Sequence, residues 1–159
     1  VNDPAIDRYR LRWNNVKYEP GEFKVVVYDE YGKEVGAETV RTAGAASRIQ
    51  LTGDLGADIK PLKADGEDMT FITVNILDKA GNLVPDACNP IHVSVTGTAH
   101  FKGICNGDAT STEVFTKPTM KAFHGQLVIG IQNNGKRGAA TVNVTSKGLK
   151  PATIIVNSK

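Results

Sequence analysis

The fold is decided by residues 125–146, GQLVIGIQNNGKRGAATVNVTS. Apolar side chains occupy every second position on both sides of the central NNGKRG segment, at Leu127, Ile129, Ile131, Ala140, Val142 and Val144. A period of two places such side chains on one face of a β-strand. The NNGKRG segment offers residues that tolerate positive φ, so we predict a β-hairpin whose apolar face covers a core.

Similar short runs, separated by turn residues, recur along the chain. The predicted strands are 9–18 (with a β-bulge at Asn14-Asn15), 22–29, 34–42, 46–53, a short one within 59–62, 68–78, 90–97, 99–104, 112–116, 125–132, 139–146 and 151–158. No window of twelve residues has a helical period. Strands spaced by about 8–12 residues are typical of all-β sandwiches. We therefore predict an all-β protein.

The junction between two modules is expected near residues 54–68, DLGADIKPLKADGED, which are rich in Gly, Asp and Lys. Residues 1–53 supply only four strands and are predicted to be part of a sandwich module. Residues 54–159 supply about seven strands, which is enough for a complete module. In the first block the predicted inward stripe consists of Leu11, Trp13, Val25, Val27 and Leu51. Trp13 is therefore expected in a core and not on a sugar-binding platform.

Charge and hydropathy exclude two classes of partner. The 159 residues carry 19 Lys and Arg against 17 Asp and Glu, a net charge of +2. This balance, without any run of like charge beyond two residues, argues against nucleic-acid binding. No stretch approaches the roughly 18 apolar residues of a membrane span. Because the chain begins at Val1 without Met or an apolar leader, we expect a processed or cloned fragment.

Candidate catalytic groups are scattered along the sequence. The acidic residues of KYEPGEFKVVVYDEYGKEV (17–35) are Glu19, Glu22, Asp29, Glu30 and Glu34, and all fall at predicted strand ends or turns. Carboxylates there lack the burial that separates the pKa values of an acid/base pair. The histidines, His92, His100 and His124, have no nucleophile elbow and no metal spacing beside them. We predict no catalytic residue, no zinc site and no cofactor.

The loop CNGDATSTE (105–113) is a weak candidate for a metal site. Asn106, Asp108 and Glu113 offer oxygen ligands of the kind that Ca²⁺ takes, but the spacing is not that of an EF-hand. The same composition is typical of a tight turn. The two cysteines, Cys88 and Cys105, form a disulfide if their strands are neighbours and are otherwise thiols.

Residues 10–44, RLRWNNVKYEPGEFKVVVYDEYGKEVGAETVRTAG, carry a family resemblance. They resemble the non-catalytic β-sandwich modules that follow the barrel of family 2 glycoside hydrolases, the β-galactosidase-like enzymes of gut Bacteroidetes. The matching positions are Trp13, Val16, Tyr18, Pro20, Gly21, Phe23, Val25, Tyr28, Gly32, Lys33 and Val35. Residues 64–97, 106–115 and 148–159 are similar to the next module of those proteins, which also resembles bacterial invasin-type repeats.

The resemblance implies an immunoglobulin-like β-sandwich, one complete module preceded by a partial one whose first strands are missing. It implies a non-catalytic accessory part of a β-galactosidase-like hydrolase of the periplasm or cell surface. The catalytic residues of that family lie in a (β/α)₈ barrel of about 250 residues, so none is carried over. Expected partners are that barrel, neighbouring sandwich domains and a second copy at the incomplete first sheet. An adhesion repeat and a carbohydrate-binding module remain alternatives, and sugar-binding residues are unknown.

Overall fold

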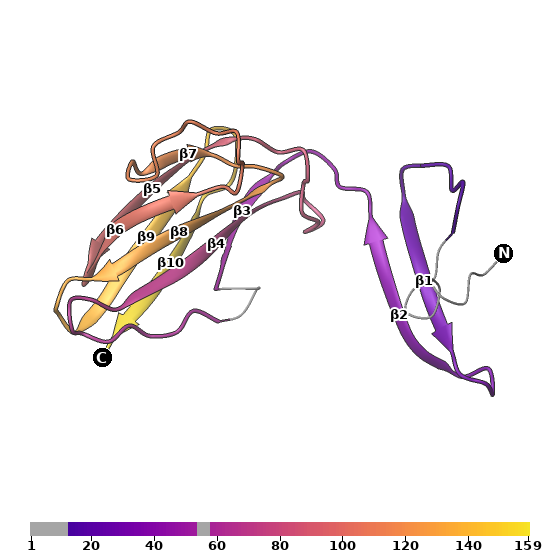
Figure 1. Cartoon of the computed structure of the whole chain (residues 1–159), viewed down its shortest axis with the longest axis horizontal. Helices are drawn as coiled ribbons and strands as arrows, with labels where there is room; N and C mark the ends of the chain where they lie inside the picture. The colour runs from indigo at the N-terminus through magenta and orange to yellow at the C-terminus, as the bar shows by residue number, and fades with distance from the viewer. Residues whose placement is uncertain (1–12, 54–57) are drawn as a thin grey trace. The chain divides into compact units, whose positions relative to one another are not determined.

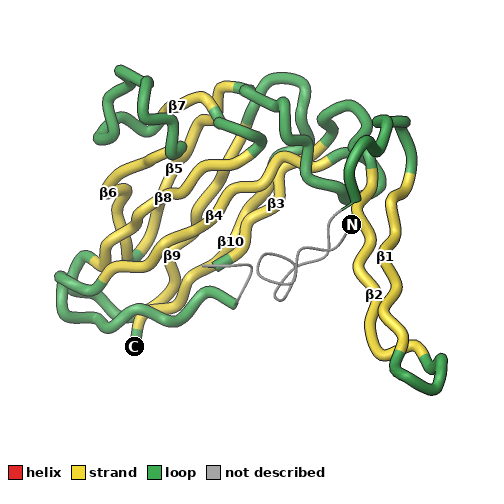
Figure 2. The backbone as a smooth tube through the Cα atoms, turned by 45° about the vertical axis from the view of Figure 1, so that its right-hand side comes forward, coloured by secondary structure: helices red, strands yellow, loops and turns green. Residues whose placement is uncertain are grey.

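The computed structural model describes residues 13–53 and 58–159, which contain ten β-strands and no helix (Figures 1 and 2). The predicted all-β class is confirmed. Within these residues no helix of a length and apolarity suited to crossing a membrane occurs. The chain divides into two compact units, Val1–Thr42 and Ala43–Lys159, each with its own internal packing.

The first unit contains one antiparallel hairpin, formed by β1 (Glu22–Tyr28) and β2 (Glu34–Arg41). Asp29 closes its turn, because one carboxylate oxygen accepts the amides of Tyr31 at 2.9 Å and Lys33 at 2.8 Å. Gly32 supplies the positive φ of 79° that this turn requires. The predicted turn and both of its strands are confirmed.

No residue described in 13–42 is fully buried. Trp13 is 58% exposed and Val27 is 48% exposed, so the predicted inward stripe is wrong at these two positions, and Leu11 lies outside the described residues. The reason is that the hairpin has no second sheet over its apolar face within 13–42. Residues 13–18 form no strand and Asn15 has a φ of 60°, so the predicted strand 9–18 is not found there, and residues 9–12 are outside the described part.

The second unit is a sandwich of two four-stranded sheets, whose strands are labelled in Figure 1. The first sheet has the order β3 (Arg48–Thr52), β4 (Met69–Leu77), β8 (Gln126–Asn133), β6 (Ala99–Cys105). The second has the order β10 (Ala152–Ser158), β9 (Gly138–Thr145), β5 (Pro90–Gly97), β7 (Thr119–Lys121). All neighbours within a sheet run antiparallel.

The core lies between these sheets and includes the inward side chains predicted within residues 125–146. Three alternating residues of each of β4, β8 and β9 are buried: Ile72, Val74, Ile76, Leu127, Ile129, Ile131, Ala140, Val142 and Val144. These side chains share one cluster with Ile91 and Val93 of β5. Closing a layer of such residues from both sides is the dominant stabilising term of a sandwich.

The segment NNGKRG, predicted to close a hairpin, is instead a connection between the sheets. Strands β8 and β9 flank NNGKRG but belong to different sheets, as do β5 and β6 on either side of Gly97. His100 therefore does not sit at a hairpin. A hairpin and a cross-over turn require the same alternation and the same positive φ, so the sequence pattern cannot separate them. Gly97 has a φ of 91°, and a Cβ there would lie 2.2 Å from the carbonyl oxygen of Ala139.

The placement of residues 48–52 in the first block is also wrong. Strand β3 pairs with β4 in the second unit, with Ile49 opposite Ile76, and the units divide after Thr42. Ile49 is buried in the sandwich core, and burial with β4 outweighs proximity in sequence to the hairpin. Leu51 likewise packs against this core.

Two short predicted strands are not formed. Within 59–62 only Leu62 makes a single bridge, parallel to Ser158. Residues 112–116 are loop and turn, with the Phe115 carbonyl accepting the Ile104 amide at 2.9 Å. The short strand in this region is β7, which pairs with β5 through three residues and was not predicted.

The chain covers one edge of β10 with its own backbone. The Leu62 amide donates to the Asn157 carbonyl at 2.8 Å, and the Ala64 amide donates to the Lys159 carbonyl at 2.8 Å. Beyond the other end of β10, the Ile49 amide donates to the Lys150 carbonyl at 3.0 Å. The backbone is thereby paired at the C-terminal end of this edge and just before its N-terminal end.

Candidate functional site

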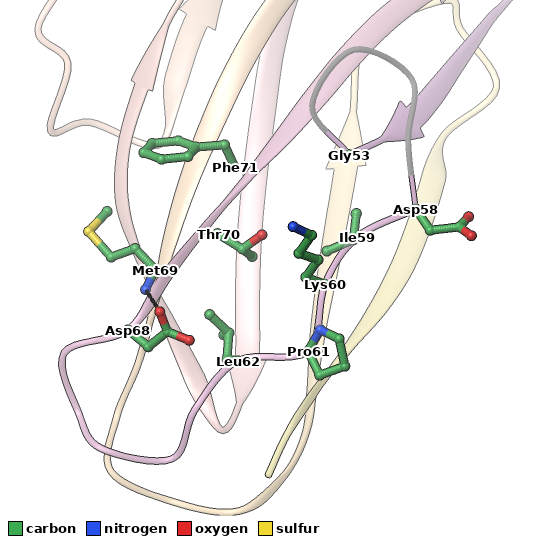
Figure 3. A pocket seen from close by; sticks show the side chains of 10 residues that line it. All are labelled: Gly53, Asp58, Ile59, Lys60, Pro61, Leu62, Asp68, Met69, Thr70 and Phe71. Carbon is green, nitrogen blue, oxygen red and sulfur yellow. Dashed lines mark hydrogen bonds between the residues drawn. The ribbon is translucent and has the colours of Figure 1, made fainter.

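A hollow of about 430 Å³ lies beside β4 in the second unit (Figure 3). Its two carboxylates, Asp58 and Asp68, stand at opposite sides of it in Figure 3. Asp68 is already used, accepting the amides of Lys63 at 2.7 Å and Met69 at 3.1 Å. The lining residues that the structure describes thus include no facing pair of carboxylates for acid/base chemistry.

The candidate metal ligands Asn106 and Asp108 hold their own loop in shape. The Asn106 side chain accepts the Asp108 amide at 3.0 Å and donates to the Lys121 carbonyl at 2.9 Å. One oxygen of Asp108 accepts the hydroxyl of Thr110 at 2.7 Å and its amide at 2.9 Å. These bonds, with a smaller contribution from His124, lower the pKa of Asp108. This is the hydrogen bonding of a tight turn.

Glu113, the third candidate, turns toward the backbone of β7. Both of its carboxylate oxygens lie within reach of the Lys121 amide, at 3.2 and 3.3 Å. Among the residues with described positions, no group of three His, Cys, Asp or Glu is placed to hold a metal ion. The loop geometry therefore favours a structural turn, and calcium binding by it stays a prediction to be tested.

The histidines and cysteines lie apart on exposed positions. His92 on β5 contacts the Thr119 hydroxyl at 3.2 Å, and His124 contacts the Pro85 carbonyl at 3.1 Å. His100 is exposed on β6. Cys88 and Cys105 are free thiols, and both are exposed. Of the two alternatives open from the sequence, the structure has the thiols.

The acidic residues of 17–35 belong to the hairpin, as predicted. Glu22 pairs with Arg41 across the two strands at 2.7 Å, and both side chains are about half exposed. Exposed cross-strand pairs of this kind contribute little, at most about 1 kcal/mol. Asp29 is the turn residue described above. The described contacts of this stretch are those of a hairpin.

Asp78, at the end of β4, is a buried charge that the sequence reasoning missed. Only 4% of it is exposed. Its carboxylate accepts the Gly44 amide at 2.8 Å, the Asn82 side chain at 2.9 Å and the Asn82 amide at 2.8 Å. These hydrogen bonds, led by that from Gly44, outweigh burial and lower the pKa of Asp78 to about 2. Asp78 thus fastens the chain that enters the sandwich to the turn after β4.

Asn133, at the end of β8, is fully buried and was also missed. Its amide nitrogen lies 3.0 Å from the carbonyl oxygens of Thr98 and Lys136 and from the Ser158 hydroxyl. Its oxygen accepts the amides of Gly66 at 3.2 Å and Gly135 at 2.7 Å. One side chain therefore joins four separate segments at one end of the sandwich, which gives it a structural role.

A signal for both residues is present in the sequence. Asn133 continues the inward run Leu127, Ile129, Ile131, and Asp78 continues the inward run Ile72, Val74, Ile76. A polar residue at the end of an inward run is buried in these two cases. Such residues need partners, because an unpaired buried polar group costs about 1–3 kcal/mol.

Comparisons with known protein families match both parts of the chain. Residues 54–155 match the family model for glycoside hydrolase family 2 C-terminal domain 5, and residues 2–36 match a domain of unknown function. A β-galactosidase of Bacteroides ovatus is 40% identical over 159 residues, which are 100% of this chain and 18% of that protein. A β-glucuronidase of Formosa agariphila is 23% identical over 99% of the chain and 16% of its own length.

Solved structures of similar proteins share the fold. A family 2 glycosyl hydrolase of Bacteroides cellulosilyticus superposes with a TM-score of 0.82 at 29% identity, covering 91% of this chain and 18% of that one. A β-glycosidase of Bacteroides vulgatus gives a TM-score of 0.80 at 25% identity, covering 89% and 18%. The chain thus spans under a fifth of these relatives. With the family model matching well over half of its residues, the chain belongs to the C-terminal domain 5 family of family 2 glycoside hydrolases.

Proposed function

We propose that this chain is a non-catalytic, structural part of a β-galactosidase-like glycoside hydrolase. The observation that carries the proposal is the 40% identity, over the whole chain, to an 18% portion of the Bacteroides ovatus β-galactosidase. The polar residues described above agree with it, since Asp78, Asn133 and Asp108 are all engaged in holding turns together. The identity to the Formosa agariphila β-glucuronidase is lower, at 23%, so galactosides are the substrates to assay first.

The test compares the full-length protein that carries this chain with the 159 residues alone. Full-length protein is expected to hydrolyse an aryl β-galactoside, and the isolated chain is expected to give no turnover above buffer. The control is the isolated chain carrying Asp58→Asn and Asp68→Asn, the two carboxylates of the 430 Å³ pocket. Turnover by the isolated chain that survives re-purification and disappears in this control would refute the non-catalytic assignment. A full-length protein inactive on aryl galactosides would refute the proposed activity.

We further propose that the exposed hairpin of the first unit makes isolated chains self-associate. The hairpin and the segment before it carry large apolar side chains that are solvent-exposed: Trp13, Val16, Tyr18, Phe23, Val27, Tyr28, Tyr31, Val35 and Val40. A two-stranded hairpin is at best marginally stable in water without a covering layer. Sedimentation velocity should show a dimer that dissociates on dilution, and a chain lacking residues 1–42 should stay monomeric. A full chain that is monomeric at all concentrations would contradict this.

The location proposed for the full-length protein is the periplasm or the cell surface, in keeping with the family resemblance. Cell fractionation followed by immunodetection of this domain is the direct check. Detection in the cytoplasmic fraction alone would reject the location and leave the structural role untouched.

A further inference from the structure

A shallow apolar groove crosses the outer face of the sheet β3-β4-β8-β6. It has a volume of about 240 Å³, and Met69, Phe71, Phe115 and Val128 form its walls. These four side chains are between 37% and 56% exposed although they stand close together. Clustered exposure of this kind marks interaction surfaces, whereas single exposed apolar residues do not.

Glycines form the floor of this groove. Gly130 on β8 pairs with Phe71 on β4 and with Gly103 on β6, so two neighbouring positions on this face lack side chains. A Cβ at Gly130 would lie 3.5 Å from the Phe71 ring and 3.6 Å from the Met69 methyl group, where it would fill the groove. The register of β6 shifts between Phe101 and Gly103, next to this floor. Bulges of this kind are frequent beside functional surfaces.

The outer face of the other sheet has a different character. Its exposed residues include His92, Ser94, Thr96, Thr119, Thr145 and Thr153. Among the described large apolar side chains of that sheet, Ile155 alone is strongly exposed, at 61%. One face thus carries a polar surface suited to water, and the other carries the groove. Both sheets are four-stranded and antiparallel, so the difference between their outer faces comes from the types of their outward-facing residues and not from the fold.

The groove lining selects an apolar occupant. Nine residues line the groove, and the seven other than Lys102 and Cys105 are apolar or glycine. A sugar would need several hydrogen-bonding groups converging on it, and a lone ammonium and a thiol do not supply them. An aliphatic or aromatic side chain from a polypeptide fits this lining, since it needs none.

The size of the groove favours a partner on the same polypeptide. A stable complex between separate chains uses about 20–30 residues on each side, against the nine that line the groove. Separate chains also lose translational and rotational freedom worth about 4–15 kcal/mol. A covalently linked segment avoids most of that cost through its high effective concentration. The relatives described above have such segments, because this chain covers only 18% of the Bacteroides ovatus protein.

We propose that this groove is the surface by which the sandwich docks onto another part of its own polypeptide, which inserts an apolar side chain between Phe71 and Phe115. The proposal rests on the proposed function in one respect, namely that the chain is part of a larger protein. It assigns an intramolecular contact to one face of one sheet and leaves the polar face of the other sheet to solvent.

The two free cysteines provide the test. Cys105 lines the groove, whereas Cys88 lies outside it, and both are exposed in the isolated chain. The rate of alkylation by N-ethylmaleimide, read for each cysteine by peptide mass spectrometry, is compared between the 159-residue chain and the full-length protein. Docking should lower the alkylation rate of Cys105 in the full-length protein by roughly tenfold or more, which corresponds to about 1.4 kcal/mol of protection. Cys88 serves as the internal reference.

Variants separate the groove from a general effect of the longer chain. Phe71→Ser should restore the Cys105 rate in the full-length protein, and Ile155→Ser, an equally exposed change on the other sheet, should not. Each rate is divided by that of the same variant in the 159-residue chain, so a change in intrinsic reactivity cancels. Val128→Ser gives a second, independent reading should Phe71→Ser fail to fold.

Three results would overturn the proposal. The first is a Cys105 that reacts equally fast in both proteins, and the second is a protected Cys105 that Phe71→Ser and Val128→Ser do not release. The third is protection of Cys105 in the 159-residue chain itself. Protection at high protein concentration would make a second copy the occupant, and protection on adding galactose would make a sugar the occupant. Because alkylation does not depend on turnover, a full-length protein without galactosidase activity leaves this test intact.

Discussion

The hairpin and the sandwich have the same strand pattern and opposite burial. In β1 of the hairpin, Phe23 is 51% exposed and Val27 is 48% exposed. In β8 of the sandwich, residues at the same alternation, Ile129 and Ile131, are 0% exposed. Alternation creates an apolar face on a strand, but burial requires a second layer opposite that face. Strand pattern and core membership are therefore separate properties, and only the first can be taken from a local sequence.

The largest effect expected from this difference concerns one buried isoleucine. Ile129→Ala should lower the free energy of unfolding by about 2–5 kcal/mol, because it removes buried carbon and leaves a cavity between the sheets. Val27→Ala in the hairpin should change it by no more than about 0.5 kcal/mol, as for most surface substitutions. Urea unfolding followed by circular dichroism measures both. Equal losses at the two sites would show that the hairpin is as well buried as the sandwich.

A smaller effect is expected for the polar part of the sandwich. Asn133→Ala should cost roughly 1–3 kcal/mol, since it leaves buried amides and carbonyls without a partner. The matched control is Asn134→Ala, which removes one exposed hydrogen bond to the Gly97 carbonyl. That control should cost at most about 1 kcal/mol. Losses of the same size in both variants would mean that water replaces the bonds of Asn133.

Low pH should destabilise the sandwich by protonating Asp78. Its folded pKa is lowered to about 2, against 3.8 for the ordinary group, so the folded state binds this proton less readily than the unfolded state. Its contribution to stability is therefore complete above pH 3.8 and is lost as the pH falls through about 2. Asp78→Asn should flatten the loss of stability between about pH 4 and 2 that urea titrations reveal.

The exposed carboxylate Asp86, changed to Asn, is the control for that experiment. The native slope should persist in Asp86→Asn. If Asp78→Asn retained the full slope as well, the acid sensitivity would come from other carboxylates, and Asp78 would have no special role in the sandwich.

The smallest effect is expected from calcium at the loop 105–113. The melting temperature of the protein should not change on adding Ca²⁺, because Asn106, Asp108 and Glu113 already form hydrogen bonds within the loop and with β7. A true site would stabilise by about 2.7 kcal/mol at a hundred times its dissociation constant. If Ca²⁺ raised the melting temperature by several degrees and Asp108→Ala abolished that rise, the loop would be a calcium-binding site.

Much of the sandwich could be predicted because its strands are long and regular. The runs around Ile72, Val93, Ile129 and Val142 alternate for several residues, and each is a strand as predicted. The inward faces predicted around Ile129 and Val142 are buried. The segments that failed are short, such as 59–62 and 112–116, where two or three residues cannot establish a period.

Other failures have a different physical cause. Which sheet a strand joins depends on distant partners, so the pairing of β3 with β4 and the separation of β8 from β9 could not be taken from local sequence. The same holds for Trp13, whose burial depends on a layer outside residues 13–42. At the candidate metal loop the sequence supplies side chains with oxygen atoms, but the direction in which those side chains point is set by local hydrogen bonds.

The covered edge of β10 bears on how sandwiches can coexist on one polypeptide. Neighbouring domains of the same architecture are at risk of exchanging strands, because an open edge accepts a foreign strand as readily as its own. Here the amides of Leu62 and Ala64 occupy carbonyls at that edge. A strand from an adjoining domain would first have to displace this segment. The segment thus closes the C-terminal end of this edge to a strand from elsewhere.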